Sequence, residues 1–115
     1  MRECSIDVEE QGDVDILRLN GSLDAYSFPR LETTLNQLRD SKRHRVILDC
    51  SGLEYISSAA LGALIGFARR SRENKGDLKM AGMTPRIYNI VELLGFHKIL
   101  EICDSIDAAM EKFRQ

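Results

Sequence analysis

The residues with the clearest chemical potential are two adjacent serines, Ser57 and Ser58. They follow a strand-like apolar run at residues 46–48 and open a helical pattern at residues 57–72. A helix begins with unpaired N–H groups and partial positive charge, so it accommodates an anion well. A phosphoryl group on either serine would add about −1.5 to −2 charges. The pattern is compatible with a modifiable surface serine, and the plainer interpretation is that one serine simply caps the helix.

Other patterns that would support catalysis are missing from the sequence. The hydrolase motif G-x-S-x-G does not occur, because Tyr55 and Ala59 occupy the glycine positions around Ser57. Neither of the common glycine-rich phosphate loops is present. His97 follows a predicted helix stop, which favours an exposed loop histidine over a general base. We therefore predict a protein that is not an enzyme and needs no cofactor, with a small enzyme using Ser58 as nucleophile as the alternative.

Length, composition and charge exclude several classes of protein. The 115 residues suit one domain, and 43% hydrophobic with 30% charged residues is ordinary for a globular chain. A net charge of −2 and only 6% aromatic residues argue against nucleic acid as a partner. The longest apolar stretch, residues 56–68, is shorter than the roughly 20 residues that span a bilayer. Charged residues also interrupt any early signal-peptide run. We expect one soluble, cytoplasmic domain over residues 1–115, without membrane insertion.

Three further patterns carry structural expectations. The cysteines are odd in number, widely spaced and without C-x-x-C, so we expect buried thiols and no disulfide framework or metal site. They are Cys4, Cys50 and Cys103. Gly62 and Gly66 form a G-x-x-x-G pattern that predicts close backbone packing of their helix. Residues 39–45 include four basic side chains, which predicts a solvated connection rather than a nucleic-acid patch.

Strand-like and helical patterns alternate along the chain. The expected strands cover residues 4–9, 14–19, 46–48, 78–81 and 99–103, and the expected helices cover residues 27–38, 57–72, 84–94 and 104–113. Residues 21–24 are expected to form a loop, and Gly52 a turn after the third strand. The resulting order, β-β-α-β-α-β-α-β-α, predicts an α/β fold with a mostly parallel sheet packed by amphipathic helices.

At three places the sequence resembles the STAS domain of anti-sigma-factor antagonists. Residues 21–25 (GSLDA) are similar to the family's G-x-L-D-A. Residues 46–56 (VILDCSGLEYI) are similar to its central strand and D-x-S turn, and residues 57–62 (SSAALG) stand in the place of D-S-[SA]-G-L-G. With the later helix opened by Thr84 and Pro85, the resemblance covers nearly the whole chain. It predicts a single STAS domain.

The resemblance implies a binding protein that is switched by phosphorylation in a partner-switching circuit. In this family an anti-sigma factor with serine kinase activity phosphorylates the serine that matches Ser58, and a PP2C-type phosphatase reverses the reaction. The unphosphorylated form binds the anti-sigma factor and releases the sigma factor. The partner-binding surface implied around Ser58 includes four further residues: Ser22, Asp24, Ser57 and Ala60.

Two residues depart from the family motif. Ser57 stands where the motif has Asp, which removes a carboxylate and supplies a second hydroxyl that could be modified instead. Ala60 stands where the motif has Gly, which adds a methyl group where a partner's backbone would approach. These departures keep an alternative open: a STAS subunit that docks on a lipid ABC transporter or a stress-signalling complex without being phosphorylated.

Overall fold

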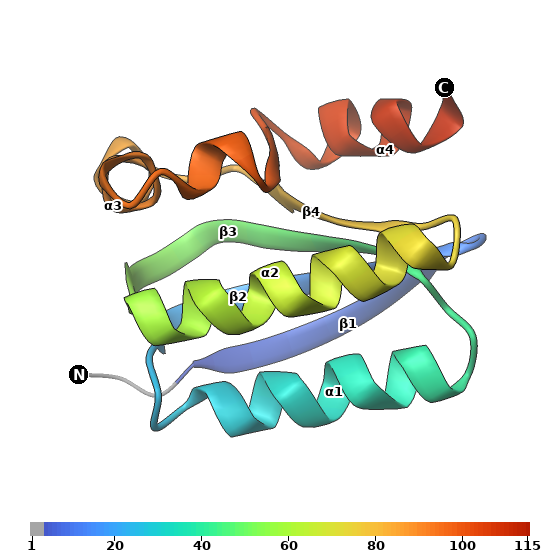
Figure 1. The fold of residues 1–115 in the computed structure, drawn as a ribbon, viewed down its shortest axis with the longest axis horizontal. Coiled ribbons are helices and arrows are strands. Elements are labelled where there is room, and N and C mark those ends of the chain that lie inside the picture. The colour runs from blue at the N-terminus through green and yellow to red at the C-terminus, as the bar shows by residue number, and fades with distance from the viewer. Residues whose placement is uncertain (1–3) are drawn as a thin grey trace.

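Five strands form one mixed sheet in the order β1-β2-β3-β4-β5 in the computed structural model, which describes residues 4–115 (Figure 1). The strands are β1 (Ser5–Gln11), β2 (Val14–Leu23), β3 (Arg45–Ile56), β4 (Asp77–Ala81) and β5 (Glu101–Cys103). β1 pairs antiparallel with β2, and the other neighbours pair in parallel. The helices are α1 (Phe28–Asp40), α2 (Ser58–Glu73), α3 (Pro85–Leu93), the short η1 (Phe96–Lys98) and α4 (Ile106–Arg114). This order confirms the predicted α/β topology.

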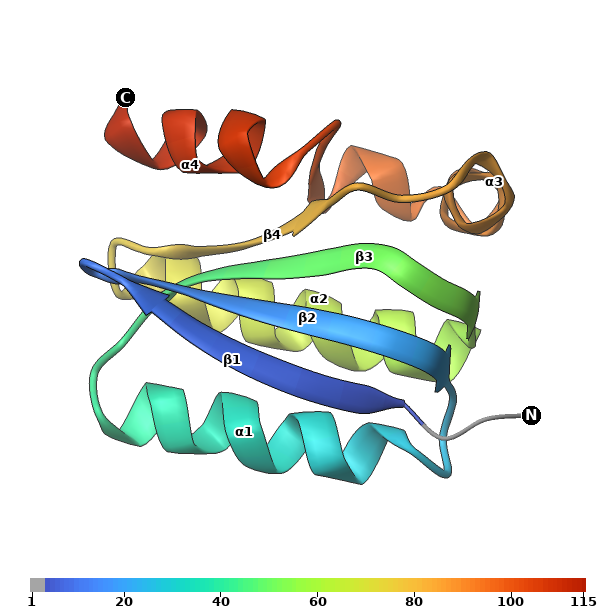
Figure 2. The ribbon, with the colours of Figure 1, turned by 180° about the vertical axis from the view of Figure 1, so that it is seen from behind.

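The central strand β3 shows why the sheet is covered on both faces. Val46 and Leu48 join a large apolar cluster with α1 and α2, whereas Ile47 between them packs in a second cluster with Ala109 of α4. Successive side chains of a strand point to opposite faces, so a continuous apolar run fits a strand buried on both sides. In Figure 2, β1 and β2 pass in front of α2, α1 lies below the strands, and α4 lies above them.

The predicted helix ends at α3 are confirmed. The Thr84 hydroxyl accepts a hydrogen bond from the Ile87 N–H, and Pro85 is the first helical residue. Beyond the helix, Gly95 has a φ of 76°, the left-handed conformation that favours glycine after a helix. The last helix begins at Ile106, two residues later than expected, and the Ser105 hydroxyl caps it by accepting the Ala108 N–H at 3.0 Å.

Two predicted connections are wrong, because β2 and β3 continue as paired strands. The expected loop at residues 21–24 is strand up to Leu23, which pairs with Ile56. The expected turn at Gly52 also lies within β3. A Cβ atom on Gly52 would lie 1.9 Å from Oδ1 of Asn20, so glycine serves the close approach of the two strands there. Parallel pairing between β2 and β3 outweighed the local turn signals.

Two expectations about packing are also wrong. The backbone at Gly62 and Gly66 does not approach a neighbouring element, since a Cβ atom at either would meet nothing within 4 Å. His97 is not an exposed loop residue: it lies half-buried in η1, with its ring edge-on to Tyr88 at 6.4 Å. The last strand begins at Glu101 and not at residue 99, because residues 99 and 100 form the turn that follows η1.

The charged connection after α1 is anchored rather than simply solvated. The guanidinium of Arg43 donates to the carboxylate of Asp15 at 2.6 Å and to the carbonyl oxygen of Gly12 at 2.8 Å. The Asp15 side chain is 2% exposed, so this ion pair is buried on one side.

The prediction of buried cysteines is confirmed, and burial raises the pKa of the Cys50 thiol to about 12. Within residues 4–115, no helix is long and apolar enough to cross a membrane.

Candidate functional site

The paired serines lie where β3 ends and α2 begins, beside the connection from β2 to α1. The Ser57 N–H donates to the carbonyl oxygen of Leu23, the last residue of β2, at 2.9 Å. Adjacent parallel strands end at the same edge of a sheet, so the segments that follow them meet there. This places Ser58 beside the turn that contains Asp24, as the resemblance implied.

The two serines have different surroundings. The Ser57 hydroxyl accepts the N–H of Ala60 at 3.1 Å and caps α2. Ser57 is half-buried. Ser58 is the first residue of the helix and is exposed, and its hydroxyl makes no hydrogen bond within residues 4–115. The cap occupies one serine and leaves the other accessible for modification.

The start of α2 offers two backbone donors to an anion. Of its first N–H groups, that of Ser57 is bonded to Leu23 and that of Ala60 to the Ser57 hydroxyl. The N–H groups of Ser58 and Ala59, at the first two helical positions, have no intrahelical acceptor. Together with the positive end of the helix dipole, they can stabilise negative charge on the Ser58 side chain.

Asp24 shapes the neighbouring turn. Its Oδ1 accepts the N–H of Ser27 at 2.9 Å and the N–H of Tyr26 at 3.0 Å. The hydrogen bond from the Ser27 N–H is the main reason that the pKa of Asp24 lies below its ordinary value. The Ser27 hydroxyl donates to the carbonyl oxygen of Ser22 at 2.7 Å and accepts the Asp24 N–H at 3.0 Å. These bonds hold the β2–α1 turn in one shape beside Ser58.

The structure corrects how two of the implied partner-binding residues could contribute. Ser22 is 2% exposed and Ala60 is 1% exposed, so neither presents its side chain as open surface. Ser22 is buried because residues 21–23 are strand, where it pairs with Tyr55. The methyl group of Ala60 packs against the apolar core. Both residues shape the surface that their neighbours expose.

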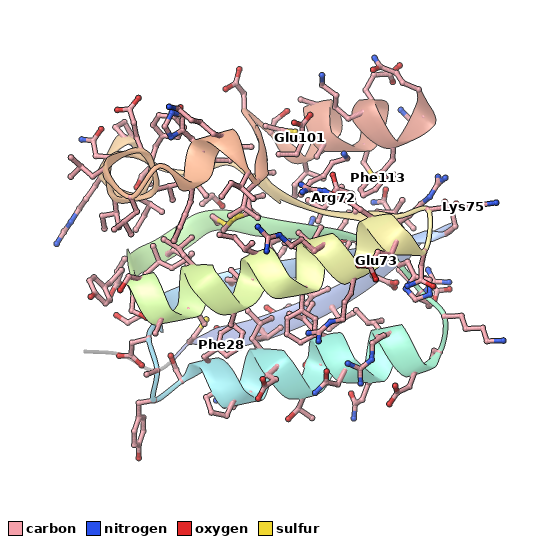
Figure 3. The ribbon with its side chains drawn as sticks, viewed as in Figure 1. Phe28, Arg72, Glu73, Lys75, Glu101 and Phe113 are labelled. Atoms are coloured by element: carbon pink, nitrogen blue, oxygen red, sulfur yellow. The ribbon has the colours of Figure 1, made fainter. Side chains whose placement is uncertain are left out.

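A shallow groove that the sequence did not reveal borders Ser58. It has a volume of about 270 Å³ and lies between the β2–α1 turn with the first turns of α1 and the start of α2. Its lining residues are Ala25, Phe28, Pro29, Glu32, Ala59 and Ala60. Phe28 lies at the start of α1 in Figure 3. Tyr26 in the same turn is 86% exposed. The pairing of parallel strand ends was the one signal that could have indicated this groove.

A second hollow lies on the other side of the strand ends. It measures about 290 Å³ and is lined by Ser22, Glu54, Tyr55 and Arg86. The Ser22 hydroxyl has no hydrogen-bond partner within residues 4–115. Tyr55 is 36% exposed, so the surface around Ser58 has an aromatic side chain on this side too.

The described residues do not assemble a second chemical centre around Ser58. Residues 4–115 contain no group of three or more His, Cys, Asp and Glu side chains that could hold a metal ion. His44 lies in the α1–β3 connection and His97 in η1, so neither histidine belongs to the segments that form the site. The arrangement provides an accessible hydroxyl, backbone donors and an apolar groove, which are features of a modifiable binding surface.

Comparison with known proteins identifies the family. The family model of the STAS domain matches residues 5–109. This chain belongs to the STAS domain family. BtrV of Bordetella bronchiseptica, named as a candidate anti-sigma factor antagonist, is 31% identical over 96 residues, covering 84% of this chain and 83% of BtrV. An anti-sigma-B factor antagonist of Staphylococcus epidermidis is 26% identical over 86 residues, covering 75% of this chain and 80% of the relative.

Solved STAS structures share the fold. An anti-sigma factor antagonist from Mycobacterium paratuberculosis superposes with a TM-score of 0.88 at 19% identity, over 98% of this chain and 96% of the other. The anti-sigma factor antagonist SpoIIAA in its unphosphorylated form gives a TM-score of 0.74 at 16% identity, over 96% and 98%. SpoIIAA of Bacillus in the phosphorylated form gives 0.71 at 14% identity, over 94% and 98%. The STAS fold of this chain therefore matches that of a protein that exists in both forms.

Proposed function

We propose that this STAS protein is an anti-sigma-factor antagonist that acts by binding in the cytoplasm and not by catalysis. In its unphosphorylated form it binds an anti-sigma factor with serine kinase activity and thereby releases the sigma factor. The relatives named as anti-sigma factor antagonists support this role. The single observation that carries the proposal is that Ser58, at the first position of α2, is exposed and its hydroxyl has no hydrogen-bond partner among the described residues 4–115.

Ser58 is the phosphorylated residue in this proposal, rather than Ser57. A phosphoryl group on Ser57 would remove the acceptor of the Ala60 N–H and disturb the helix cap. A phosphoryl group on Ser58 leaves that cap intact and lies within reach of the two unpaired N–H groups at the helix start. Modification at Ser58 therefore changes the surface without changing the fold.

The phosphoryl group blocks docking through charge and desolvation. It adds about −1.5 to −2 charges next to the groove formed by Ala59, Phe28 and their neighbours. A partner that covers this groove must then bury or face that charge. Like charges brought together in an interface cost several kcal/mol, which is enough to abolish binding at cellular concentrations. Removal of the group by a PP2C-type phosphatase restores the mostly apolar surface, in which Glu32 is the one charged lining residue.

Phosphopeptide mapping after incubation with the cognate anti-sigma factor and ATP tests the modified position. We expect one phosphoryl group within residues 56–69, lost in Ser58→Ala and retained in Ser57→Ala. Ser57→Ala is the matched control, because it removes the adjacent hydroxyl and leaves Ser58 in place. Incorporation that disappears in Ser57→Ala and persists in Ser58→Ala would overturn the assignment.

The second candidate function is a STAS subunit that docks on a lipid ABC transporter or a stress-signalling complex without being phosphorylated. The residue that favours it is Ser57, because the motif's carboxylate is absent beside the acceptor. A STAS-fold structure of a sulfate transporter family protein from Wolinella succinogenes, at a TM-score of 0.75 and 22% identity over 92% of this chain and 88% of the other, shows that the fold also occurs in transporter proteins. Capture of a transporter ATPase, with no phosphoryl incorporation at either serine, would select this function.

A further inference from the structure

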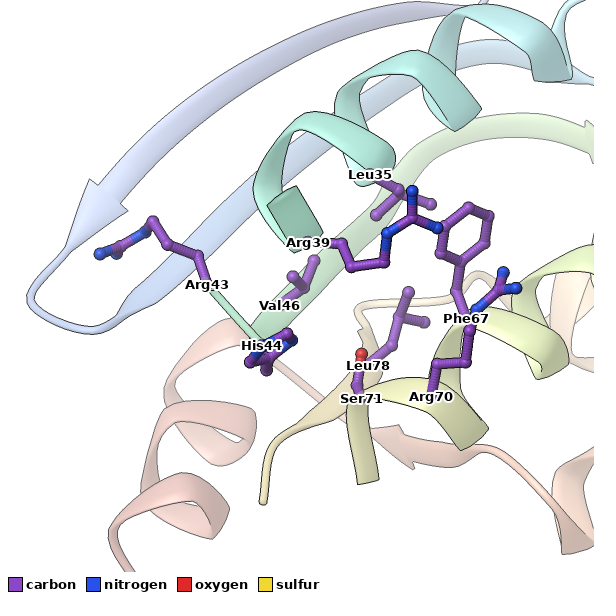
Figure 4. Close-up of a pocket in the computed structure, with 9 residues that line it drawn as sticks. All are labelled: Leu35, Arg39, Arg43, His44, Val46, Phe67, Arg70, Ser71 and Leu78. Atoms are coloured by element: carbon purple, nitrogen blue, oxygen red, sulfur yellow. The ribbon is translucent and has the colours of Figure 1, made fainter. Parts of the chain in front are cut away.

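A concentration of positive charge lies at the end of α2 that is remote from Ser58. Two hollows meet there and share Arg43 and His44 in their walls. One has a volume of about 20 Å³ and lies between the last turns of α1 and α2, as Figure 4 shows. The other has a volume of about 160 Å³ and lies between the β1–β2 turn, the α1–β3 connection and the α2–β4 connection.

We call the cationic residues that line these two hollows the basic end. They are Arg39, Lys42, Arg43, Arg45, Arg70 and Lys75. They make up six of the sixteen Lys and Arg residues of a chain whose net charge is −2. The hollows have a single acidic lining residue, Asp13. The walls of the two hollows therefore carry six basic side chains against one acidic side chain, although the chain as a whole is slightly acidic.

Ion pairs neutralise only half of the basic end. Arg43 pairs with Asp15 and lies 3.9 Å from Glu10, and Arg45 pairs with Asp13 at 3.2 Å. Arg39 pairs with its sequence neighbour Asp40 at 3.4 Å. The other three cations have no acidic partner within residues 4–115. They are Lys42, Arg70 and Lys75.

The backbone at the two unpaired lysines supports a role for their charge. Lys42 has a φ of 61° and Lys75 a φ of 64°, and no other non-glycine residue among residues 4–115 has a positive φ. Each follows the last residues of a helix, a position where glycine or asparagine is the usual choice. Holding a long cationic side chain there costs conformational energy that glycine would avoid. Both strained lysines line the same 160 Å³ hollow.

The chemistry of the basic end favours carboxylates presented by a protein. A hollow of about 160 Å³ has room for the side chain of an Asp or Glu residue. The guanidinium of Arg70 lies 4.8 Å from the Phe67 ring centroid, which leaves its outer N–H groups free for a carboxylate. None of the large exposed apolar side chains of residues 4–115 lines either hollow, which disfavours insertion into a membrane and stacking on nucleic-acid bases.

We propose that the basic end is a second interaction surface, which binds an acidic segment of a partner protein through Lys42, Lys75 and Arg70. Figure 3 shows Lys75 at the end of α2, whereas α2 starts at Ser58 on the other side of the molecule. A helix of 16 residues is about 24 Å long, so a partner can occupy either surface without contacting the other. The proposal does not rest on the function assigned to Ser58.

Fluorescence anisotropy of the full chain with a fluorescein-labelled octaglutamate peptide tests this surface. We expect binding that weakens with added salt, and no binding of an octaglutamine peptide. Lys42→Asn and Lys75→Asn each remove one charge at a position where asparagine tolerates the left-handed backbone. Each should weaken octaglutamate binding by about threefold or more, with a melting temperature that is unchanged or slightly higher because backbone strain is relieved. Lys98→Asn, in η1, is the matched control and should bind as the wild type does.

Two sets of results would overturn the proposal. In the first, Lys42→Asn and Lys75→Asn bind octaglutamate as tightly as Lys98→Asn does. In the second, vesicles containing phosphatidylserine or a single-stranded oligonucleotide bind more tightly than octaglutamate, which would assign the charge to a membrane or to nucleic acid. Ser58→Asp should leave octaglutamate binding unchanged, so this measurement is separate from the test of the phosphorylation site.

Discussion

At its first residue, helix α2 presents the Ser58 hydroxyl beside an apolar groove, and at its last turns it lies among the six cations of the basic end. The first surface is mostly apolar, with Glu32 as its one charged lining residue, so a phosphoryl group on Ser58 would change its character strongly. The second surface is already charged. Positive charge also suits the negative end of the helix dipole, as the arginines in the last turn of α2 illustrate.

The two ends also differ in how they are joined to the fold. Around Ser58, the side chains of Asp24 and Ser57 accept backbone N–H groups and the Ser27 hydroxyl donates to a backbone carbonyl, so the backbone is fixed while the Ser58 side chain stays outside the network. At the basic end, Arg43 is itself part of the network through buried Asp15. The difference between Ser58 and Arg43 indicates that a side chain can serve as a switch when its modification does not lower the stability of the fold.

The largest expected effect on stability is at the basic end. Arg43→Met leaves the buried Asp15 carboxylate without its partner and should lower the free energy of unfolding by about 3 kcal/mol. Urea denaturation of the variant and the wild type measures this loss in the free energy of unfolding. Arg45→Met is the control, since its partner Asp13 is 74% exposed and the loss should stay below about 1 kcal/mol. Equal losses in both variants would contradict the distinction between an ion pair with a buried carboxylate and an ion pair with an exposed one.

A smaller effect distinguishes the two serines. Ser57→Ala removes the acceptor of the Ala60 N–H and should destabilise the protein by about 1 kcal/mol. Ser58→Ala removes only an exposed hydroxyl and should change stability by less than about 0.5 kcal/mol. Thermal unfolding of both variants measures this difference. A larger loss in Ser58→Ala than in Ser57→Ala would show that Ser58 is a structural residue.

The smallest effect concerns the turn that borders Ser58. The folded state lowers the pKa of Asp24, so its contribution to stability is complete above the unfolded value of about 4 and is lost as the pH falls through the lower folded value. Asp24→Asn should therefore be less stable than the wild type at pH 6, and the gap should narrow below pH 4.

Chemical denaturation at several pH values measures the gap. Asp7→Asn is the matched control, because Asp7 is exposed and makes no side-chain hydrogen bond within residues 4–115. A gap for Asp24→Asn that is independent of pH would contradict the role of its carboxylate in the turn.

Local patterns predicted most of the fold. The run at residues 46–48 predicted a buried strand, and Thr84 with Pro85 predicted a helix start, because both depend on neighbours in sequence. The burial of Ser22 and the place of Gly52 within β3 depend on the parallel register between β2 and β3, which no local pattern encodes. The turn signals at these positions were therefore misleading.

The candidate site was predicted in part for the same reason. The position of Ser58 at a helix start follows from the chain's own alternation of strand and helix. The groove beside it combines residues from α1 and α2, and the basic end combines Lys42 with Lys75 from separate connections. Such surfaces depend on which segments the sheet brings together, so the sequence indicated their residues without their proximity.

The central claim is that charge on Ser58 controls docking of the anti-sigma factor. Isothermal titration calorimetry with the cognate anti-sigma factor and the wild type, Ser58→Ala and Ser58→Asp tests it most directly. We predict that Ser58→Ala binds as the wild type does, and that Ser58→Asp binds about 100-fold more weakly or not at all, with an unchanged melting temperature. Equal affinities of Ser58→Ala and Ser58→Asp would contradict the phosphorylation switch.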